Sequence, residues 1–485
     1  MRTLTKSRFA LFFGNRGFFP PELILQARKQ MCYILKKQGY EVLVMDEALT
    51  KYGAISNKDD AEKYANFLKQ NEGKYDGVIL SLPNFGDESS AVEALRKALV
   101  PIFIQAYPDE LNKMAPEFRR DAFCGKFSVM DVFYQYGMKF TSLKPHVVSP
   151  ASKDFQLNIE HFDRVCRVVN GFKDMVVGAV GSRTTAFKTV RIDELALQQN
   201  GITMEVIDLT EVFARMESFS TTSSEYKDKA KRLKDYTTWN GVPDESFDKI
   251  VRLAVVLDKL FDEWNLDAMG FRCWIELQRQ LNISACVVLS EMNDRKIPVA
   301  CEVDIGNAVS QYALYRASRE PTACLDWNNN YGDEPDQCIL FHCGSTAQSL
   351  MKGKGKVSDH SMLQYDLQVG PNCSFGCNEG RIAAFPFTFS SMTTRNGQLE
   401  FYLGQGEFTE DPIPEEFFGC GGVAKIDNLQ DVLLFIGKNG HRHHVSITPG
   451  SRLVEPIKEA LEYYLGYNVA IPQRMEITNA ISKQS

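Results

Sequence analysis

The stretch from residue 9 to residue 46, FALFFGNRGFFPPELILQARKQMCYILKKQGYEVLVMD, decides the fold class of the first part of the chain. It holds an apolar run at Phe9–Gly14, a segment of helical period at 21–38 and a second apolar run at Glu41–Asp46. Two strands joined by a helix of this length are typical of a βαβ unit, whose strands are parallel. The sequence therefore predicts an α/β sheet here.

The same alternation continues along the chain. Ala61–Gln70 and Ser89–Ala98 have helical character, and the runs Gly77–Leu82 and Pro101–Ala106 have the character of buried strands. We therefore expect an N-terminal α/β domain at residues 1–170.

The pattern restarts with the strand Met175–Val180, followed by Met204–Leu209 and the long amphipathic segment Phe247–Trp264. This predicts a second α/β domain with a parallel sheet at residues 171–350. From about Lys352 the segments become short and are broken by Gly and Asn, which is typical of a β-rich, barrel-like domain, here 351–485 with a terminal helix.

Length, charge and hydropathy limit the class of protein. A chain of 485 residues exceeds the roughly 250–300 at which one core stops growing, so several domains are expected. A net charge of −7 without a dense Lys/Arg run disfavours nucleic acid as a partner. We find no secretory signal and no apolar run long enough for a membrane span, so we expect a cytoplasmic protein without membrane contact.

Three apolar runs in the second domain end in polar residues: Ile297–Asp304, Thr322–Asp326 and Gln337–His342. In a parallel sheet the carboxyl ends of the strands line the ligand crevice, so the polar ends should converge there. Strand alternation would place Ala300, Glu302 and Asp304 on one face. Burying two carboxylates is costly without compensation, and a metal ion would supply it.

Carboxylates together with imidazoles favour Mn²⁺ or Mg²⁺ over a structural zinc site. The segment His441-Arg-His-His444 holds three of the seven histidines of the chain and could complete such a site. Each residue also has an ordinary alternative. Glu302 or Asp326 could be a helix cap or an ion-pair partner, and His342 could be a hydrogen-bonded core histidine.

Four motifs carry a resemblance to a known family: Ala300-Cys-Glu-Val-Asp-Ile-Gly306, Asp326-Trp-Asn-Asn329, Phe341-His-Cys-Gly344 and Gly440-His-Arg-His-His444. In order and spacing they resemble the L-fucose isomerase and L-arabinose isomerase superfamily. The turn Gly14-Asn-Arg-Gly17 fits as well, so the resemblance spans nearly the whole chain. It implies an aldose–ketose isomerase that acts on an open-chain sugar through a cis-enediol intermediate.

The resemblance also implies a division of roles. Glu302 and Asp326 would hold Mn²⁺ and move the proton, and His444 would complete the metal shell, with His443 as the other choice for the late ligand or as a sugar contact. The arabinose branch adds a histidine from the middle of the chain, which maps to His342. That branch has glutamate where this chain has Asp326, which favours the fucose branch.

Further sugar contacts are expected from Arg16, Phe85, Trp274 and Trp327, although such aromatics also belong to cores. The family resemblance implies that the region of Arg16 reaches the site of a neighbouring subunit, in a homotrimer or homohexamer. Two alternatives stay open. The same chemistry could act on arabinose or on a sulfonated or deoxy hexose, with Arg16 or Arg381 meeting the added group, or the chain could be a non-catalytic sugar-binding protein.

Overall fold

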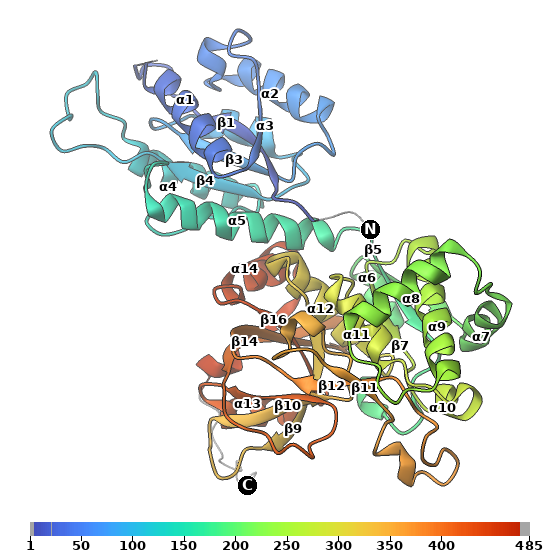
Figure 1. Ribbon diagram of the computed structural model, residues 1–485. Helices are drawn as coiled ribbons and strands as arrows, with labels where there is room; N and C mark the ends of the chain where they lie inside the picture. The colour runs from blue at the N-terminus through green and yellow to red at the C-terminus, as the bar shows by residue number, and fades with distance from the viewer. Residues whose placement is uncertain (1–3, 21, 476–485) are drawn as a thin grey trace. The chain divides into compact units, whose positions relative to one another are not determined.

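The computed structural model describes residues 4–20 and 22–475 (Figure 1). Parts of three expectations, the segment at 21–38 and the outer ends of domains 1–170 and 351–485, lie outside the described residues. The chain divides into two compact units. One comprises the residues up to Asn170 together with Glu459–Gly466, and the other comprises Gly171–Lys458 and the residues from Tyr467 onward.

The N-terminal unit contains a parallel four-stranded α/β sheet in the order β2-β1-β3-β4. Its elements are β1 (Arg8–Phe13), α1 (Glu22–Lys37), β2 (Glu41–Val44), α2 (Lys58–Gln70), β3 (Gly77–Leu82), α3 (Glu88–Leu95), β4 (Ile102–Ala106), α4 (Ala122–Gln135) and α5 (Lys153–Gly171). Phe9 and Leu11 belong to one apolar core and Ala10 and Phe12 to another. Both faces of the sheet are therefore covered, which explains why its strands are mostly apolar.

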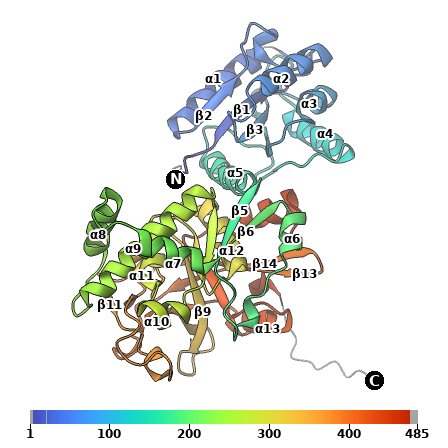
Figure 2. The ribbon, with the colours of Figure 1, turned by 90° about the vertical axis from the view of Figure 1, so that its right-hand side faces the viewer.

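The second unit begins with another parallel sheet, in the order β6-β5-β7-β8, so the same winding recurs (Figure 2). Its elements are β5 (Met175–Val180), α6 (Glu194–Gln199), β6 (Ile202–Ile207), α7 (Leu209–Ser218), α8 (Ser224–Tyr236), α9 (Asp244–Glu263), β7 (Ala268–Phe271), α10 (Glu276–Leu281), α11 (Cys286–Asp294), β8 (Val299–Cys301) and α12 (Ile305–Ser318). Helices α7, α9 and α11 pack on one face of this sheet. Helix α12 packs against β7 and β8 and also against barrel strands β13 and β16.

The rest of this unit is a closed barrel of six strands, because β14 pairs with β15 in addition to the order β15-β10-β9-β16-β13-β14. The barrel strands are β9 (Ala323–Asn330), β10 (Gln337–His342), β13 (Pro386–Arg395), β14 (Gln398–Phe408), β15 (Cys420–Lys425) and β16 (His444–Pro449). The other elements are β11 (Lys356–Ser358), β12 (Cys377–Arg381), α13 (Leu429–Lys438), α14 (Val454–Lys458) and β17 (Asn468–Ala470). The expected fold class, two α/β sheets followed by a β-barrel, is confirmed.

Two expectations about the second sheet are wrong. The runs at 322–326 and 337–342 do not extend the parallel sheet but form β9 and β10 of the barrel, which pair antiparallel. The connection 331–336 is too short for a parallel crossover, which needs about a dozen residues. The division into domains 171–350 and 351–485 stays a prediction, with β9 and β10 on the barrel side of the fold.

The second error concerns the strand that precedes α12. Strand β8 ends at Cys301, so Ala300, Glu302 and Asp304 do not share a strand face. Glu302 and Val303 form the turn that follows, and Asp304 is the N-cap of α12, its side chain accepting the N–H of Asn307. The apolar alternation in the sequence continues through residues that the backbone places in a turn.

Candidate metal and catalytic site

The turn between β8 and α12 carries Glu302 in an unusual backbone conformation. Glu302 has φ 63° and Val303 has φ 57°, both in the left-handed region, which a β-branched valine rarely adopts. Hydrogen bonds fix the turn, since Val303 N donates to Phe271 O (3.2 Å) and Asp304 N donates to Cys301 O (3.0 Å). Backbone strain of this kind accumulates where a side chain must be held for function.

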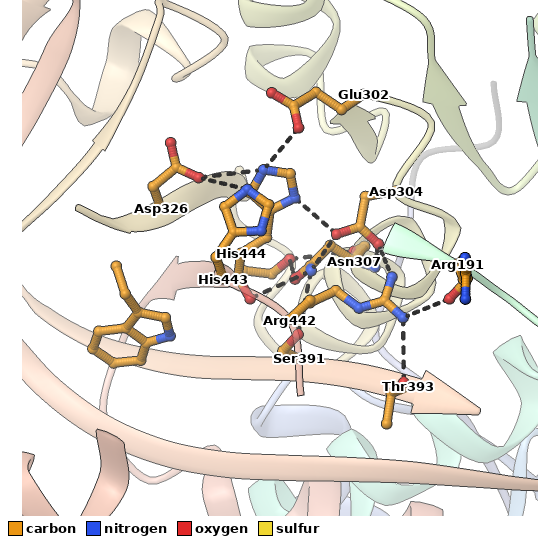
Figure 3. Close-up of polar contacts among 12 residues, drawn as sticks. Arg191, Glu302, Asp304, Asn307, Asp326, Ser391, Thr393, Arg442, His443 and His444 are labelled. Atoms are coloured by element: carbon orange, nitrogen blue, oxygen red, sulfur yellow. Dashed lines mark hydrogen bonds and ion pairs between the residues drawn. The ribbon is translucent and has the colours of Figure 1, made fainter. Parts of the chain in front are cut away.

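The barrel supplies Asp326 and His444 from neighbouring strands. They are paired residues in the β9–β16 register, so their side chains share one face. His444 Nε2 lies 3.3 Å from Asp326 Oδ1 and 3.5 Å from Glu302 Oε2, and His443 Nε2 lies 3.5 Å from Asp326 Oδ1 (Figure 3). The structure thus brings Glu302, Asp326, His443 and His444 together.

Asp304 lies behind His444 rather than among the residues that face the site (Figure 3). Its Oδ2 is 2.8 Å from His444 Nδ1 and accepts the amide of Asn307 (2.8 Å), while its Oδ1 pairs with Arg442. Although burial alone would raise it, Arg442 and His444 hold the pKa of Asp304 well below its usual range. Both oxygens of this buried carboxylate are therefore occupied by protein partners.

The pKa values of the site residues reflect its burial. Burial and the neighbouring Asp326 raise the pKa of Glu302 to about 7, and burial also raises the pKa of Asp326. Burial alone would lower the pKa of His444, but Cys324, Asp304 and Asp326 raise it above its ordinary value. A metal cation bound between these carboxylates would compete with a proton for Nε2 of His444.

The donor atoms themselves test whether a metal fits. Among the described residues, five buried atoms that belong to this site have no hydrogen-bond partner: Glu302 Oε2, Asp326 Oδ1, His342 Nε2, His443 Nδ1 and His444 Nε2. Two sets of three side chains offer ligand atoms within 4.8 Å of one another, namely Glu302–His443–His444 and Asp326–His342–His444. Carboxylate oxygens mixed with imidazole nitrogens suit Mn²⁺, so the residues fit the expected metal.

The predicted sugar contacts fall in different places. Trp274 donates its Nε1–H to Glu302 Oε1 (3.3 Å), so it borders the site. Trp327 donates instead to the hydroxyl of Tyr402 (3.2 Å) and packs edge-on against Phe389 in the barrel core. The structure therefore brings Trp274 to the site and places Trp327 in the barrel packing.

Arg16 and Phe85 belong to the N-terminal unit, where they follow β1 and β3. The guanidinium of Arg16 lies over the ring of Phe85 at 4.4 Å, its Nε donates to Gly86 O (2.8 Å), and it pairs with Glu88. The order β2-β1-β3-β4 reverses direction between β1 and β3, and ligands of α/β sheets bind at the carboxyl ends of the strands at such a point.

Two side chains near the site were missed by the sequence reasoning. Phe187 stacks on His443 (5.4 Å between ring centroids) and meets Trp274 edge-on (5.2 Å). Its only sequence signal is its place in the polar loop after strand β5. Arg442 is buried between two histidines of the late cluster, where its charge is balanced by Asp304. A buried arginine with a carboxylate partner far away in the sequence leaves no local signal.

Two models of known protein families match this chain. Residues 10–173 match the family model "Fucose/sulfoquinovose isomerase, N-terminal domain", and residues 340–472 match "L-fucose isomerase, C-terminal domain". Together the two matches cover more than half of the chain. The protein is an isomerase. It belongs to the L-fucose isomerase-like family and is an aldose–ketose isomerase of a sugar.

Relatives carry a more specific name. The sulfoquinovose isomerase of Priestia aryabhattai is 21% identical over 398 residues, which cover 82% of this chain and 85% of that one. The sulfoquinovose isomerase of Clostridium sp. (strain MSTE9) is 29% identical over 299 residues, covering 60% and 64%. A solved structure of a periplasmic solute-binding protein of Actinobacillus succinogenes with bound D-allose aligns with 65% of this chain and 93% of that one at 10% identity. Its TM-score of 0.17 is too low to indicate a shared fold.

Proposed function

We propose that the chain is a divalent-metal-dependent isomerase of an open-chain sulfonated hexose, with Mn²⁺ as the preferred ion. The observation that carries the metal is a set of three buried atoms without a hydrogen-bond partner, Glu302 Oε2, Asp326 Oδ1 and His444 Nε2. His444 Nε2 lies within 3.5 Å of both carboxylate oxygens. Buried polar atoms without partners are costly, and a cation at their centre would satisfy the carboxylates and one or more imidazoles at once. The sulfonated substrate is proposed from the names of the relatives, sulfoquinovose isomerases.

In this proposal the two carboxylates, Glu302 and Asp326, carry out the proton transfer. The metal, when bound, would polarise the carbonyl and hydroxyl oxygens of the sugar and lower the cost of negative charge on them. Glu302 takes the proton from C2 and returns it at C1 through a cis-enediol, and Asp326 helps to move a hydroxyl proton. Trp274 holds the other oxygen of Glu302, Oε1, through its Nε1–H.

The sulfonate needs a cationic partner. Arg381 is a poor candidate, because its Nη1 and Nη2 donate to backbone carbonyls of Gly380, Pro414 and Phe417 (2.8–2.9 Å). We keep Arg16, which pairs with Glu88 in the single chain, as the proposed partner on the family resemblance alone, supplied by a neighbouring subunit of a homotrimer or homohexamer, with Phe85 beside it. L-fucose and L-arabinose remain alternative substrates. The cytoplasmic location also stays a prediction, and no helix in the described residues is long and apolar enough to cross a membrane.

The test is an assay of ketose formation from sulfoquinovose, L-fucose and L-arabinose, on protein stripped with a chelator and then supplied with Mn²⁺. We expect turnover of the sulfonated sugar only after Mn²⁺ is added. In Glu302→Gln and Asp326→Asn turnover should fall about 10²–10⁴-fold, the usual contribution of general acid–base groups. Full turnover by the stripped protein would contradict the metal, and a preference for an unsulfonated sugar would contradict the substrate.

A further inference from the structure

The hydrogen bonds of His342 define which of its ring nitrogens carries hydrogen. His342 is the last residue of β10 and is 1% exposed. Its Nδ1 accepts the backbone N–H of Cys343 at 2.9 Å. A ring nitrogen that accepts a hydrogen bond carries no hydrogen, so the neutral imidazole has its hydrogen on Nε2. Nε2 of His342 is therefore a donor, whereas a metal ligand needs a free lone pair.

His444 has the opposite arrangement. Its Nδ1 faces Oδ2 of Asp304 at 2.8 Å, and Asp304 is an acceptor because its carboxylate also pairs with Arg442. The hydrogen of the neutral ring therefore lies on Nδ1, and the lone pair of Nε2 points toward Glu302 and Asp326. A carboxylate that orients a histidine in this way is the usual companion of a metal-binding imidazole. The two buried histidines thus offer different groups to the same site.

The N–H of His342 has no acceptor among the described residues, although Nε2 is buried. His342 lines a small cavity of about 20 Å³ together with Glu302, Trp274 and His360. One of its ring nitrogens also lies within 4.8 Å of ligand atoms of Asp326 and His444. A buried donor left unpaired costs about 1–3 kcal/mol, so this cavity is expected to supply an acceptor, either a water molecule, for which it has room, or an oxygen of the substrate.

We propose that His342 donates its Nε2–H to an oxygen of the open-chain sugar that gains negative charge during the proton transfer, and that it is not a metal ligand. This inference rests on the proposed function and makes it more specific. Glu302, Asp326 and the Nε2 of His444 then hold the cation, and the Nε2–H of His342 stabilises the developing charge. Removing one such donor from an active site costs about 10²–10³-fold in turnover.

Two variants separate a donor from a ligand. His342→Gln keeps an N–H near the position of Nε2, and His342→Leu removes the donor while keeping an apolar side chain of moderate volume. His444→Gln is the matched control, since it changes the proposed ligand in the same way. Each protein is stripped of metal, titrated with Mn²⁺ by calorimetry and then assayed with sulfoquinovose at saturating Mn²⁺.

We expect both His342 variants to bind Mn²⁺ within a few-fold of the wild type, while His444→Gln loses more than about 100-fold in affinity. The kcat of His342→Leu should fall about 10²–10³-fold, and His342→Gln should recover most of that loss.

If His342→Gln loses Mn²⁺ affinity as His444→Gln does, His342 is a ligand and the proposal is overturned. An unchanged kcat in His342→Leu would overturn the donor role. If His342→Leu fails to fold, the Mn²⁺ titration of His342→Gln still decides. Failure of the proposed function differs from these outcomes, because the wild type itself would then not bind Mn²⁺ or not turn over the sugar.

Discussion

At the scale of single residues, the site depends on how side chains far apart in the sequence constrain one another. The motifs around Glu302, Asp326 and His444 could be found in the sequence because each is a local run with a family resemblance. The pairing of Asp304 with His444 and Arg442 could not, since 138–140 positions separate these partners. The sequence pattern grouped Asp304 with Glu302 as a carboxylate that a metal could compensate, but its occupied oxygens favour a role in orienting His444.

Asp304→Asn tests that role. The amide accepts fewer hydrogen bonds than the carboxylate and leaves the buried charge of Arg442 unpaired, so the orientation of His444 should weaken. We predict that Mn²⁺ affinity falls about 10–100-fold, less than on loss of a ligand, while kcat at saturating Mn²⁺ stays near that of the wild type. Calorimetric titration provides the measurement, with the exposed Asp333→Asn as the control of equal charge change. A complete loss of binding would instead make Asp304 a ligand.

The raised pKa of Glu302 predicts how the metal-free protein responds to pH. The folded state holds the carboxyl proton up to about pH 7, while the unfolded chain releases it near 4.5, so stability is lost as the pH rises between these values. Glu302→Gln removes this loss. One pKa unit is worth about 1.4 kcal/mol, so the variant should exceed the wild type by up to about 3 kcal/mol at pH 8 and by little at pH 4.

Urea unfolding in the presence of a chelator measures this difference. The gain of Glu302→Gln should grow as the pH is raised from 4 to 8. A gain that is the same at both pH values would show that burial of an ionised Glu302 is not its cause.

At the scale of elements, helix α12 connects the sheet that presents Glu302 with the barrel that presents Asp326 and His444. Gly306 permits this contact, because a Cβ there would lie 2.3 Å from Met392 O and 2.6 Å from the Arg442 guanidinium. The strands β9 and β10 show where the sequence pattern stops being informative. An apolar run that ends in a polar residue looks the same in a parallel sheet and in a barrel, and only the short connection between the two strands distinguishes them.

Gly306→Ala should therefore destabilise the protein by about 1–3 kcal/mol or more, since a backbone carbonyl cannot move aside as a flexible side chain can. The displaced Arg442 should also weaken Mn²⁺ binding through Asp304. Gly437→Ala is the matched control, because α13 leaves open space at that Cβ, and it should be neutral or stabilising by up to about 1 kcal/mol. The midpoints of urea denaturation of both variants, compared with that of the wild type, measure this difference in stability. Equal midpoints would contradict the close approach of α12 to β13.

At the scale of the whole molecule, the sequence predicted the order of architectures because strand and helix periodicities are local. The N-terminal sheet, the second sheet with the same strand order and the barrel all follow that order. Closure of the barrel through the pairing of β14 with β15 could not be predicted, since it joins segments that no sequence pattern connects. Assembly is likewise a property beyond the single chain, and it was predicted from family resemblance alone.

Helix α4 supports the prediction of an oligomer. Phe123 and Phe127 are each 53% exposed, and their ring centroids lie 5.6 Å apart. Tyr134 on the same helix is 81% exposed. Exposed aromatic groups of this kind are typical of interfaces. We predict a homotrimer or homohexamer in sedimentation analysis, and Phe123→Ser with Phe127→Ser should shift it toward smaller species. A fully active monomer would contradict the prediction and the proposed sharing of Arg16 between subunits.

The central claim is that Glu302, Asp326 and His444 together hold one divalent cation. Calorimetric titration of Mn²⁺ into the metal-stripped protein tests it most directly, because the result does not depend on knowing the sugar. We predict one Mn²⁺ per chain in the wild type, release of protons from the ligand side chains on binding, and no measurable binding in Asp326→Asn over the same concentration range. Binding by Asp326→Asn with the affinity of the wild type, or no binding by the wild type, would contradict it.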